Sequence, residues 1–135
     1  MSFNDKTIDA LATALNFRQM RQEIIASNIA NSETPGYKAK RIDFEEALAR
    51  ALDVDGQSSL KATDKRHFNV GQGDISNISP DIYEDPNGQV TANGNTVDRD
   101  KEMALMAENK ILYDAAIQLL NKKLSLKKYI LSSER

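Results

Sequence analysis

The sequence contains no cysteine and no tryptophan, and it has a single histidine, His67. A chain without cysteine forms no disulfide, no thiolate metal site and no cysteine nucleophile. Catalysis needs a constellation of residues, and no serine or aspartate stands at a recognisable triad spacing from His67. We therefore expect His67 to be structural or exposed, and the sequence predicts that the protein is not an enzyme.

Two short patterns that faintly resemble ligand sites fail on their spacing. The run Asp53-Val-Asp-Gly56, followed by Asp64, places its glycine too early for a calcium-binding loop. Gly71-Gln-Gly73 lacks the further glycine and the basic phosphate ligand of a nucleotide site. The sequence therefore predicts no metal, no cofactor and no small-molecule substrate.

Long hydrophobic runs are also missing. Nowhere do about 18 apolar residues follow one another, and no basic flank precedes an apolar run at the start of the chain. The sequence therefore predicts neither a membrane span nor a cleaved Sec-type signal. At 135 residues, with 40% hydrophobic and 28% charged residues, the chain has the size and composition of one folded domain.

The net charge of −2 hides an uneven distribution along the chain. Residues 1–50 are neutral, residues 51–100 carry four basic and nine acidic groups, and residues 101–135 carry seven basic and four acidic groups. The basic end contains Lys122, Lys123, Lys127 and Lys128, which we expect near the C-terminal end of a helix, where the helix dipole favours them. Because no dense basic face accompanies them, nucleic acid is not an expected partner. A soluble helical binding module that docks an acidic partner is an alternative function.

The first helical pattern runs from about Asp5 to Ser32. One side gathers Ile8, Leu11, Leu15, Ile25 and Ile29 when residues are wound at about 100° each. A second apolar stripe, Phe17, Met20 and Ile24, falls almost opposite. One partner helix cannot cover both sides, so either the middle of the chain or another subunit must cover the second stripe.

This helix is expected to stop at the run Asn28-Ile-Ala-Asn-Ser-Glu-Thr-Pro-Gly-Tyr37-Lys38. Pro35 and Gly36 suit the two central positions of a type II turn, because proline presets a negative φ and glycine accepts a positive one. Thr34 precedes a proline and is therefore disfavoured in a helix. We expect the helix to end near Asn31 or Ser32, with Tyr37 placed immediately beyond the turn.

A second and longer helical pattern runs from about Asp98 to Leu131. Four leucines recur every seven residues, Leu105, Leu112, Leu119 and Leu126. Beside them run Met106, Tyr113 and Leu120, then Ile117, Leu124 and Leu131. Together these residues predict a broad coiled-coil-like face that pairs with the first helix.

The middle of the chain has a different composition. A short helix is expected over Asp43–Arg50, and a hairpin over Asp81–Thr91 with Asp85-Pro-Asn-Gly88 as its turn. We expect Val54–Gln72 to be the most mobile part. The predicted fold is mainly α, with residues 1–52 and 98–135 pairing into one helical domain around an irregular middle segment, 53–97.

Two segments of the chain together resemble the bacterial axial family of flagellar rod, hook and hook-associated proteins. The first comprises Asn28, Asn31, Thr34, Pro35, Gly36, Tyr37 and Lys38, with Phe44 beyond them. The second comprises Val97, Asp98, Glu102, Met103, Met106, Asn109 and Tyr113, at the start of the second helix. The short length and small middle are similar to the proximal rod proteins, of which one sister type is favoured and the other is the alternative.

The resemblance implies a structural subunit of the flagellar basal body that assembles by helix packing into a helical tube and transmits motor torque. It implies export through the flagellar type III apparatus without a cleaved signal, and assembly in the periplasm. The implied partners are copies of the chain itself, other rod proteins, and the export-gate and MS-ring junction proteins at the base. In this interpretation Phe17, Met20 and Ile24 pack against neighbouring subunits, and Tyr37 and Lys38 reach an adjacent one.

Overall fold

The computed structural model describes residues 3–52 and 78–133. Within them it has three helices and two strands: α1 (Phe3–Ala30), β1 (Lys40–Asp43), α2 (Glu45–Leu52), β2 (Asp81–Glu84) and α3 (Arg99–Ser133). The sequence predictions for His67, Asp53–Gly56, Asp64, Gly71–Gly73 and Val54–Gln72 lie outside the described residues.

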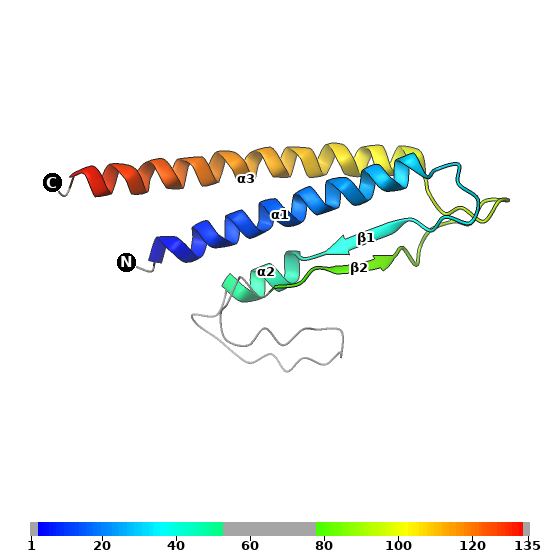
Figure 1. Ribbon diagram of the computed structural model, residues 1–135, viewed down its shortest axis with the longest axis horizontal. Helices are drawn as coiled ribbons and strands as arrows, with labels where there is room; N and C mark the ends of the chain where they lie inside the picture. The colour runs from blue at the N-terminus through cyan, green and yellow to red at the C-terminus, as the bar shows by residue number, and fades with distance from the viewer. Residues whose placement is uncertain (1–2, 53–77, 134–135) are drawn as a thin grey trace.

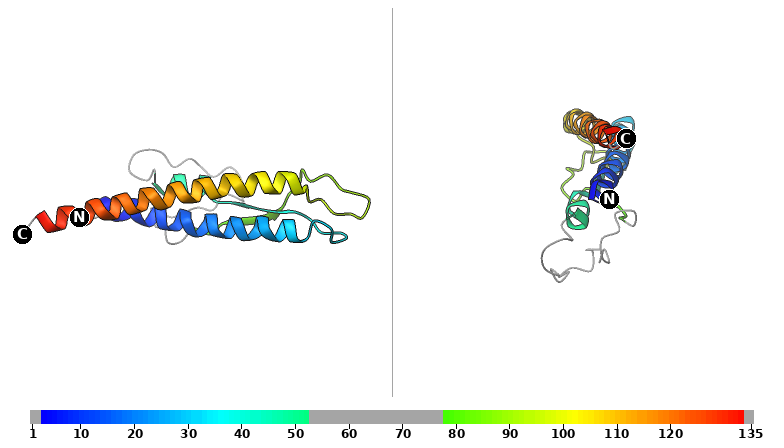
Figure 2. Two further views of the ribbon diagram at one scale, coloured as in Figure 1. Left: turned by 90° about the horizontal axis from the view of Figure 1, so that it is seen from above. Right: turned by 90° about the vertical axis from the view of Figure 1, so that its left-hand side faces the viewer.

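The two long helices form an antiparallel pair (Figure 1). With 28 and 35 residues, α1 and α3 extend about 42 Å and about 52 Å. Three layers lie side by side: α3, then α1, then the two strands with α2 (Figures 1 and 2). The last turns of α3 reach beyond the first turn of α1. The prediction of a mainly α fold with paired terminal helices is confirmed.

The second apolar side of α1 is covered by the middle of the same chain. The rings of Phe17 and Phe44 lie 5.2 Å apart, and both residues are buried. Met20 and Ile24 pack against the same cluster, which also includes buried Ile42 of β1. The hypothesis that this stripe faces neighbouring subunits is therefore wrong for Phe17, because the segment that follows the turn folds back over it.

The two strands correct the prediction of a local hairpin. β2 pairs with β1, antiparallel, with Arg41 opposite Tyr83 and Ile42 opposite Ile82. The turn after β2 does form, because the Asn87 N–H donates to Oδ1 of Asp85 at 2.9 Å. Beyond it the chain makes no strand but runs back to the end of α1, where its polar groups find partners.

The boundaries of the two later helices shift from those expected. Asp43 ends β1, so α2 begins at Glu45 instead of Asp43. Asp98 precedes α3, and its Oδ1 accepts the N–H of Lys101 at 3.3 Å, as an N-cap does. The last turn of α3 contains no basic residue, so the expectation that the helix dipole accounts for the C-terminal lysines is wrong.

The side of α3 that faces α1 is not the leucine heptad. The covered residues repeat at alternating intervals of four and three: Glu102, Met106, Asn109, Tyr113, Ala116, Leu120, Lys123 and Lys127, all buried or half-buried. Leu112, Leu119 and Leu126 lie to one side of this seam and are 40%, 46% and 56% exposed. Of the broad face predicted from the sequence, Met106, Tyr113 and Leu120 lie on the seam, whereas Leu112, Leu119 and Leu126 lie beside it with roughly half of their surface open.

Candidate functional site

The turn after α1 has the predicted geometry. Gly36 has a φ of 75°, and the Tyr37 N–H donates to the Thr34 carbonyl at 3.2 Å, as in a type II turn. Asn31, at the end of the helix, accepts the Thr34 hydroxyl at 3.1 Å through its Oδ1. Thr34, Pro35 and Gly36 themselves are exposed, so what matters here is the direction that the turn gives to the chain.

Asn28, in the last turn of α1, is fully buried and organises the return of the chain. Its Nδ2 donates to the Lys40 carbonyl at 2.9 Å, and its Oδ1 accepts the Lys40 N–H at 3.0 Å. The same oxygen accepts the Tyr37 hydroxyl at 3.3 Å. Asn28 thus binds both backbone groups of the first residue of β1, and this fixes the strand against the helix.

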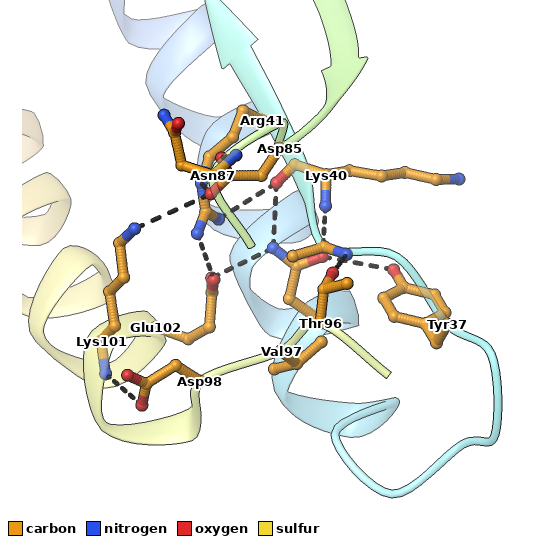
Figure 3. Close-up of polar contacts among 12 residues, drawn as sticks. Tyr37, Lys40, Arg41, Asp85, Asn87, Thr96, Val97, Asp98, Lys101 and Glu102 are labelled. Carbon is orange, nitrogen blue, oxygen red and sulfur yellow. Dashed lines mark hydrogen bonds and ion pairs between the residues drawn. The ribbon is translucent and has the colours of Figure 1, made fainter. Parts of the chain in front are cut away.

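The remaining donor of Asn28 reaches α3. Its Nδ2 donates to Oε2 of Glu102 at 3.0 Å. Arg41 donates to Oε1 of the same carboxylate at 2.6 Å, and its Nε donates to Oδ2 of Asp85 at 3.2 Å (Figure 3). Lys101 forms an ion pair with Asp85 at 3.7 Å. Elements α1, β1, the turn after β2 and α3 therefore meet at this point.

The charges at this junction compensate one another. Burial alone lowers the pKa of Arg41, but Glu102 and Asp85 outweigh it and leave that pKa raised. The pKa of Asp85 is lowered, first by the hydrogen bond from the Asn87 N–H and then by the charges of Arg41 and Lys101. Both shifts favour the charged forms of Arg41 and Asp85 at neutral pH.

Asn95 connects the second family segment to the turn. Its Nδ2 donates to the carbonyls of Asn31 and Thr34, both at 2.8 Å, in addition to the backbone N–H that each of these carbonyls accepts within the turn. Its Oδ1 accepts the Val97 N–H at 2.7 Å. Next to it, Oγ1 of Thr96 accepts the Ala39 N–H at 2.9 Å. We call Asn28, Tyr37, Arg41, Asn95 and Glu102 the signature cluster.

Tyr37 and Lys38 are engaged within the chain, which corrects the expectation that they reach an adjacent subunit. The Tyr37 hydroxyl contacts Asn28, and the Tyr37 carbonyl accepts the Thr96 N–H at 3.0 Å. Nζ of Lys38 donates to the Gly94 carbonyl at 3.0 Å. Both side chains thus close the junction between the turn and the segment that leads into α3.

A second polar contact lies further along the seam. Asn109 donates through Nδ2 to the Arg18 carbonyl at 2.8 Å and to Oε1 of Gln22 at 2.9 Å. Nη1 of Arg18 donates back to Oδ1 of Asn109 at 3.3 Å. Because a buried amide must find its partners, Asn109 and Glu102 together favour one register between α1 and α3.

The other residues singled out from the sequence have separate places. Phe44 is in the core, Asp98 caps α3, Met106 and Tyr113 lie half-buried on the seam, and Met103 is 57% exposed. Sequence reasoning missed the roles of Arg41, Asp85, Asn95 and Thr96. Asn95 and Thr96 carry only the ordinary signal of a loop residue, and nothing local indicates that their partners lie more than 50 residues away.

The site is built to hold its parts together. Within residues 3–52 and 78–133, no buried side-chain nitrogen or oxygen lacks a hydrogen-bond partner. In the same part of the chain no three histidine or acidic side chains group as a metal site. None of the helices described is both long and apolar enough to cross a bilayer.

Comparison with a family model and comparison with individual proteins both give the same family. The family described as flagella basal body rod protein matches residues 8–38. The flagellar basal body rod protein FlgB of Bacillus subtilis is 40% identical over 134 residues, 98% of each chain. FlgB of Aeromonas hydrophila is 36% identical over 90% of this chain and 89% of its own, and FlgB of Salmonella typhimurium 36% identical over 82% of each.

These relatives do not favour either alternative, the sister rod protein FlgC or a non-flagellar binding module. The similarity covers both terminal helices and the signature cluster between them. The chain belongs to the FlgB family of flagellar basal body rod proteins, which are structural proteins and not enzymes.

Proposed function

We propose that this chain is a structural subunit of the proximal rod of the flagellar basal body, and that the signature cluster sets the shape in which it assembles. A helical polymer repeats one contact many times, so a small change in the angle between its parts accumulates along the assembly. The cluster fixes the two terminal helices and the strand pair relative to each other. Its role is therefore geometric.

The observation that carries this proposal is the bond between Asn28 and Glu102. These residues lie 74 positions apart, in the two segments that resemble the family, and both are fully buried. A buried amide and carboxylate are stable only when each finds its partner, so the pair forms in one arrangement of the helices. In this proposal residues 1–52 and 98–135 form one helical domain, and residues 53–97 connect its halves.

Such long-range contacts also suit a subunit that is exported before it folds. Neither helix can bury Asn28 or Glu102 without the other, so the cluster forms only after both ends of the chain have arrived. We infer passage through the type III apparatus without a cleaved signal, and folding in the periplasm. The proposed neighbours are further copies of this chain, other rod proteins, and the junction proteins between the rod, the export gate and the MS ring.

Complementation tests this function. A flagellated bacterium that lacks its own copy of this protein is supplied with the tagged chain, and basal bodies are isolated. We expect the wild-type chain in the rod and restored swimming. Glu102→Ala should be exported but excluded from rods, whereas Glu84→Ala, a matched change at an exposed site of β2, should behave as the wild type. If the complemented cells swim but their basal bodies do not contain the wild-type chain, the proposal is refuted.

A further inference from the structure

The outer face of α3 carries an apolar ridge between two carboxylates. Met103 and Ile111 are 57% and 69% exposed, and Ala107 lies between them. At about 100° per residue, these side chains share a sector of about 80° with Asp100 and Asp114. We call these five residues the acidic ridge. Large side chains so exposed on a structural protein indicate a contact with another molecule.

A groove lies on a different side of the same helix. Its volume is about 240 Å³, and α1, β1 and α3 all contribute to its walls. The apolar part of its lining comprises Ile24, Ile25, Ile42, Leu105 and Leu112. A row of leucines continues from it along α3 as Leu119 and Leu126, also exposed.

The groove has a basic rim. Five basic residues line it and only two acidic ones, Asp43 and Glu108. Of the basic residues, Arg21, Arg41 and Lys101 already form ion pairs within the chain. Arg18 and Lys40 form none with the carboxylates of the described residues. The pKa of Arg18 is lowered, first by burial and then by the charge of Arg21, and the charges of Glu45 and Glu108 offset this only in part.

The ridge and the groove complement each other and cannot meet within one molecule. One is apolar with acidic flanks and the other is apolar with a basic rim. On the wheel of α3 the ridge is centred about 150° from Leu105 and Leu112, so it points away from the groove. A contact between two such surfaces is heterologous, leaves one free surface of each kind on every pair, and propagates.

We propose that the acidic ridge of one copy docks in the basic groove of a second copy of this chain. This contact presupposes the role as a rod subunit and names the surfaces that the rod subunit uses. The carboxylates of Asp100 and Asp114 lie toward the rim that carries Arg18 and Lys40, and Ile111 enters between the helices.

Because the chain has no cysteine, single cysteines report this contact cleanly. Ile111→Cys on the ridge is mixed with Asp43→Cys on the β1 wall of the groove, and disulfides are formed in the purified full chain and in isolated basal bodies. We expect a heterodimer of the two variants. The control mixes Ile111→Cys with Ala26→Cys, an exposed position of α1 outside the groove. This mixture should give about tenfold less heterodimer, because docking of the ridge in the groove does not bring position 26 next to position 111.

Each other outcome overturns the inference. A dimer of Ile111→Cys with itself in the absence of the groove variant would indicate an isologous contact. Rods that contain both cysteine variants and support swimming, but yield no link between positions 111 and 43, would refute these surfaces while leaving the rod function intact. A photo-reactive residue at Leu112 that attaches only to another basal-body protein would show that the groove has a different occupant.

Discussion

The side-chain amide of Asn28 donates to Oε2 of Glu102 at 3.0 Å, and neither residue has any exposed surface. The pair joins the end of the first helix to the first turns of the last one. Arg41 supplies the second donor to the same carboxylate. The stability of the helix pair therefore depends on polar groups that are costly to leave without partners.

Replacement of Glu102 is expected to destabilise the chain strongly. Glu102→Ala leaves the amide of Asn28 and part of the Arg41 guanidinium without an acceptor, which should lower the free energy of unfolding by about 3 kcal/mol. Glu102→Gln keeps one acceptor and should cost less, about 1–2 kcal/mol. Urea unfolding of the purified chain measures both. Equal losses for Glu102→Ala and the exposed control Glu84→Ala would contradict this account of the cluster.

The seam between the helices explains what the sequence could and could not predict. The lengths of α1 and α3 follow from their apolar periodicity, and Pro35-Gly36 correctly predicts the turn. The broad apolar face predicted for α3 includes Met106, Tyr113 and Leu120 of the seam, but it also includes the heptad leucines beside the seam and leaves out Glu102 and Asn109. From sequence alone, a carboxylate on a helix is expected to be exposed. Glu102 is buried because Arg41 faces it, and Arg41 lies 61 residues away in the sequence, so no local pattern indicates the pair.

The other differences also arise from contacts between distant segments. The Asp85–Gly88 turn is visible locally, but β2 pairs with β1 because burial of Ile42 and Phe44 holds β1 against α1 and offers it as a template. The same return of the chain covers Phe17. The sequence left open whether the chain itself or another subunit covers this side, and only the tertiary arrangement decides it.

At Gly36 the backbone conformation, and not space, should decide which residues are tolerated. Its φ is 75°, and a Cβ added there would have no neighbour within 4 Å. Gly36→Ala should cost about 1–2 kcal/mol, Gly36→Asn less, since asparagine tolerates this region, and Gly36→Val more. Urea unfolding ranks the three variants, and swimming in complemented cells shows whether the turn direction matters for assembly.

Gly88 provides the contrast to Gly36. A Cβ added at Gly88 would lie 2.7 Å from Cβ of Thr96, a buried residue, and Gly88 has no positive φ. Gly88→Asn should therefore be at least as harmful as Gly88→Ala, the reverse of the order at Gly36. Asparagine and valine of equal effect at Gly36 would argue against a requirement for positive φ there.

Asn95 should be needed for its donor group. Asn95→Asp keeps the shape and the acceptor for the Val97 N–H but replaces the amide that donates to the Asn31 and Thr34 carbonyls. The new charge would face two carbonyl oxygens, so we expect a loss of about 2–3 kcal/mol at neutral pH. The loss should shrink in acid, where the carboxyl regains a proton to donate. Asn121→Asp, exposed on α3, is the matched control and should change stability little; a loss as large as that of Asn95→Asp would refute the donor role.

Asp85 should contribute to the loss of stability in acid. Its pKa in the folded chain is lowered, first by the Asn87 N–H and then by Arg41 and Lys101, so the unfolded chain binds its proton more readily. The resulting stability is present above the unfolded pKa of about 3.9 and is lost as the pH falls through the folded value. Asp85→Asn should therefore be about 1 kcal/mol less stable at pH 7 and show a flatter decline below pH of about 4.

Urea midpoints measured from neutral pH into the acid range test this dependence on Asp85. Asp81→Asn, at an exposed position of β2, is the matched control. It should retain the steep acid decline of the wild type. If Asp85→Asn declines in parallel with the wild type, the carboxylate does not carry the proposed linkage.

Phe17 and Leu126 should separate stability from assembly. Phe17 is 7% exposed and packs on Phe44, so Phe17→Ala should lower the free energy of unfolding by about 3–5 kcal/mol, and Phe17→Leu by clearly less. Leu126 is 56% exposed on α3, so Leu126→Ala should change the free energy of unfolding by less than about 0.5 kcal/mol. Yet Leu126→Ala should reduce incorporation into rods, because it removes apolar surface available to a neighbour. A Phe17→Ala chain that folds as well as the wild type but fails to enter rods would reverse this assignment and return Phe17 to the contact between subunits.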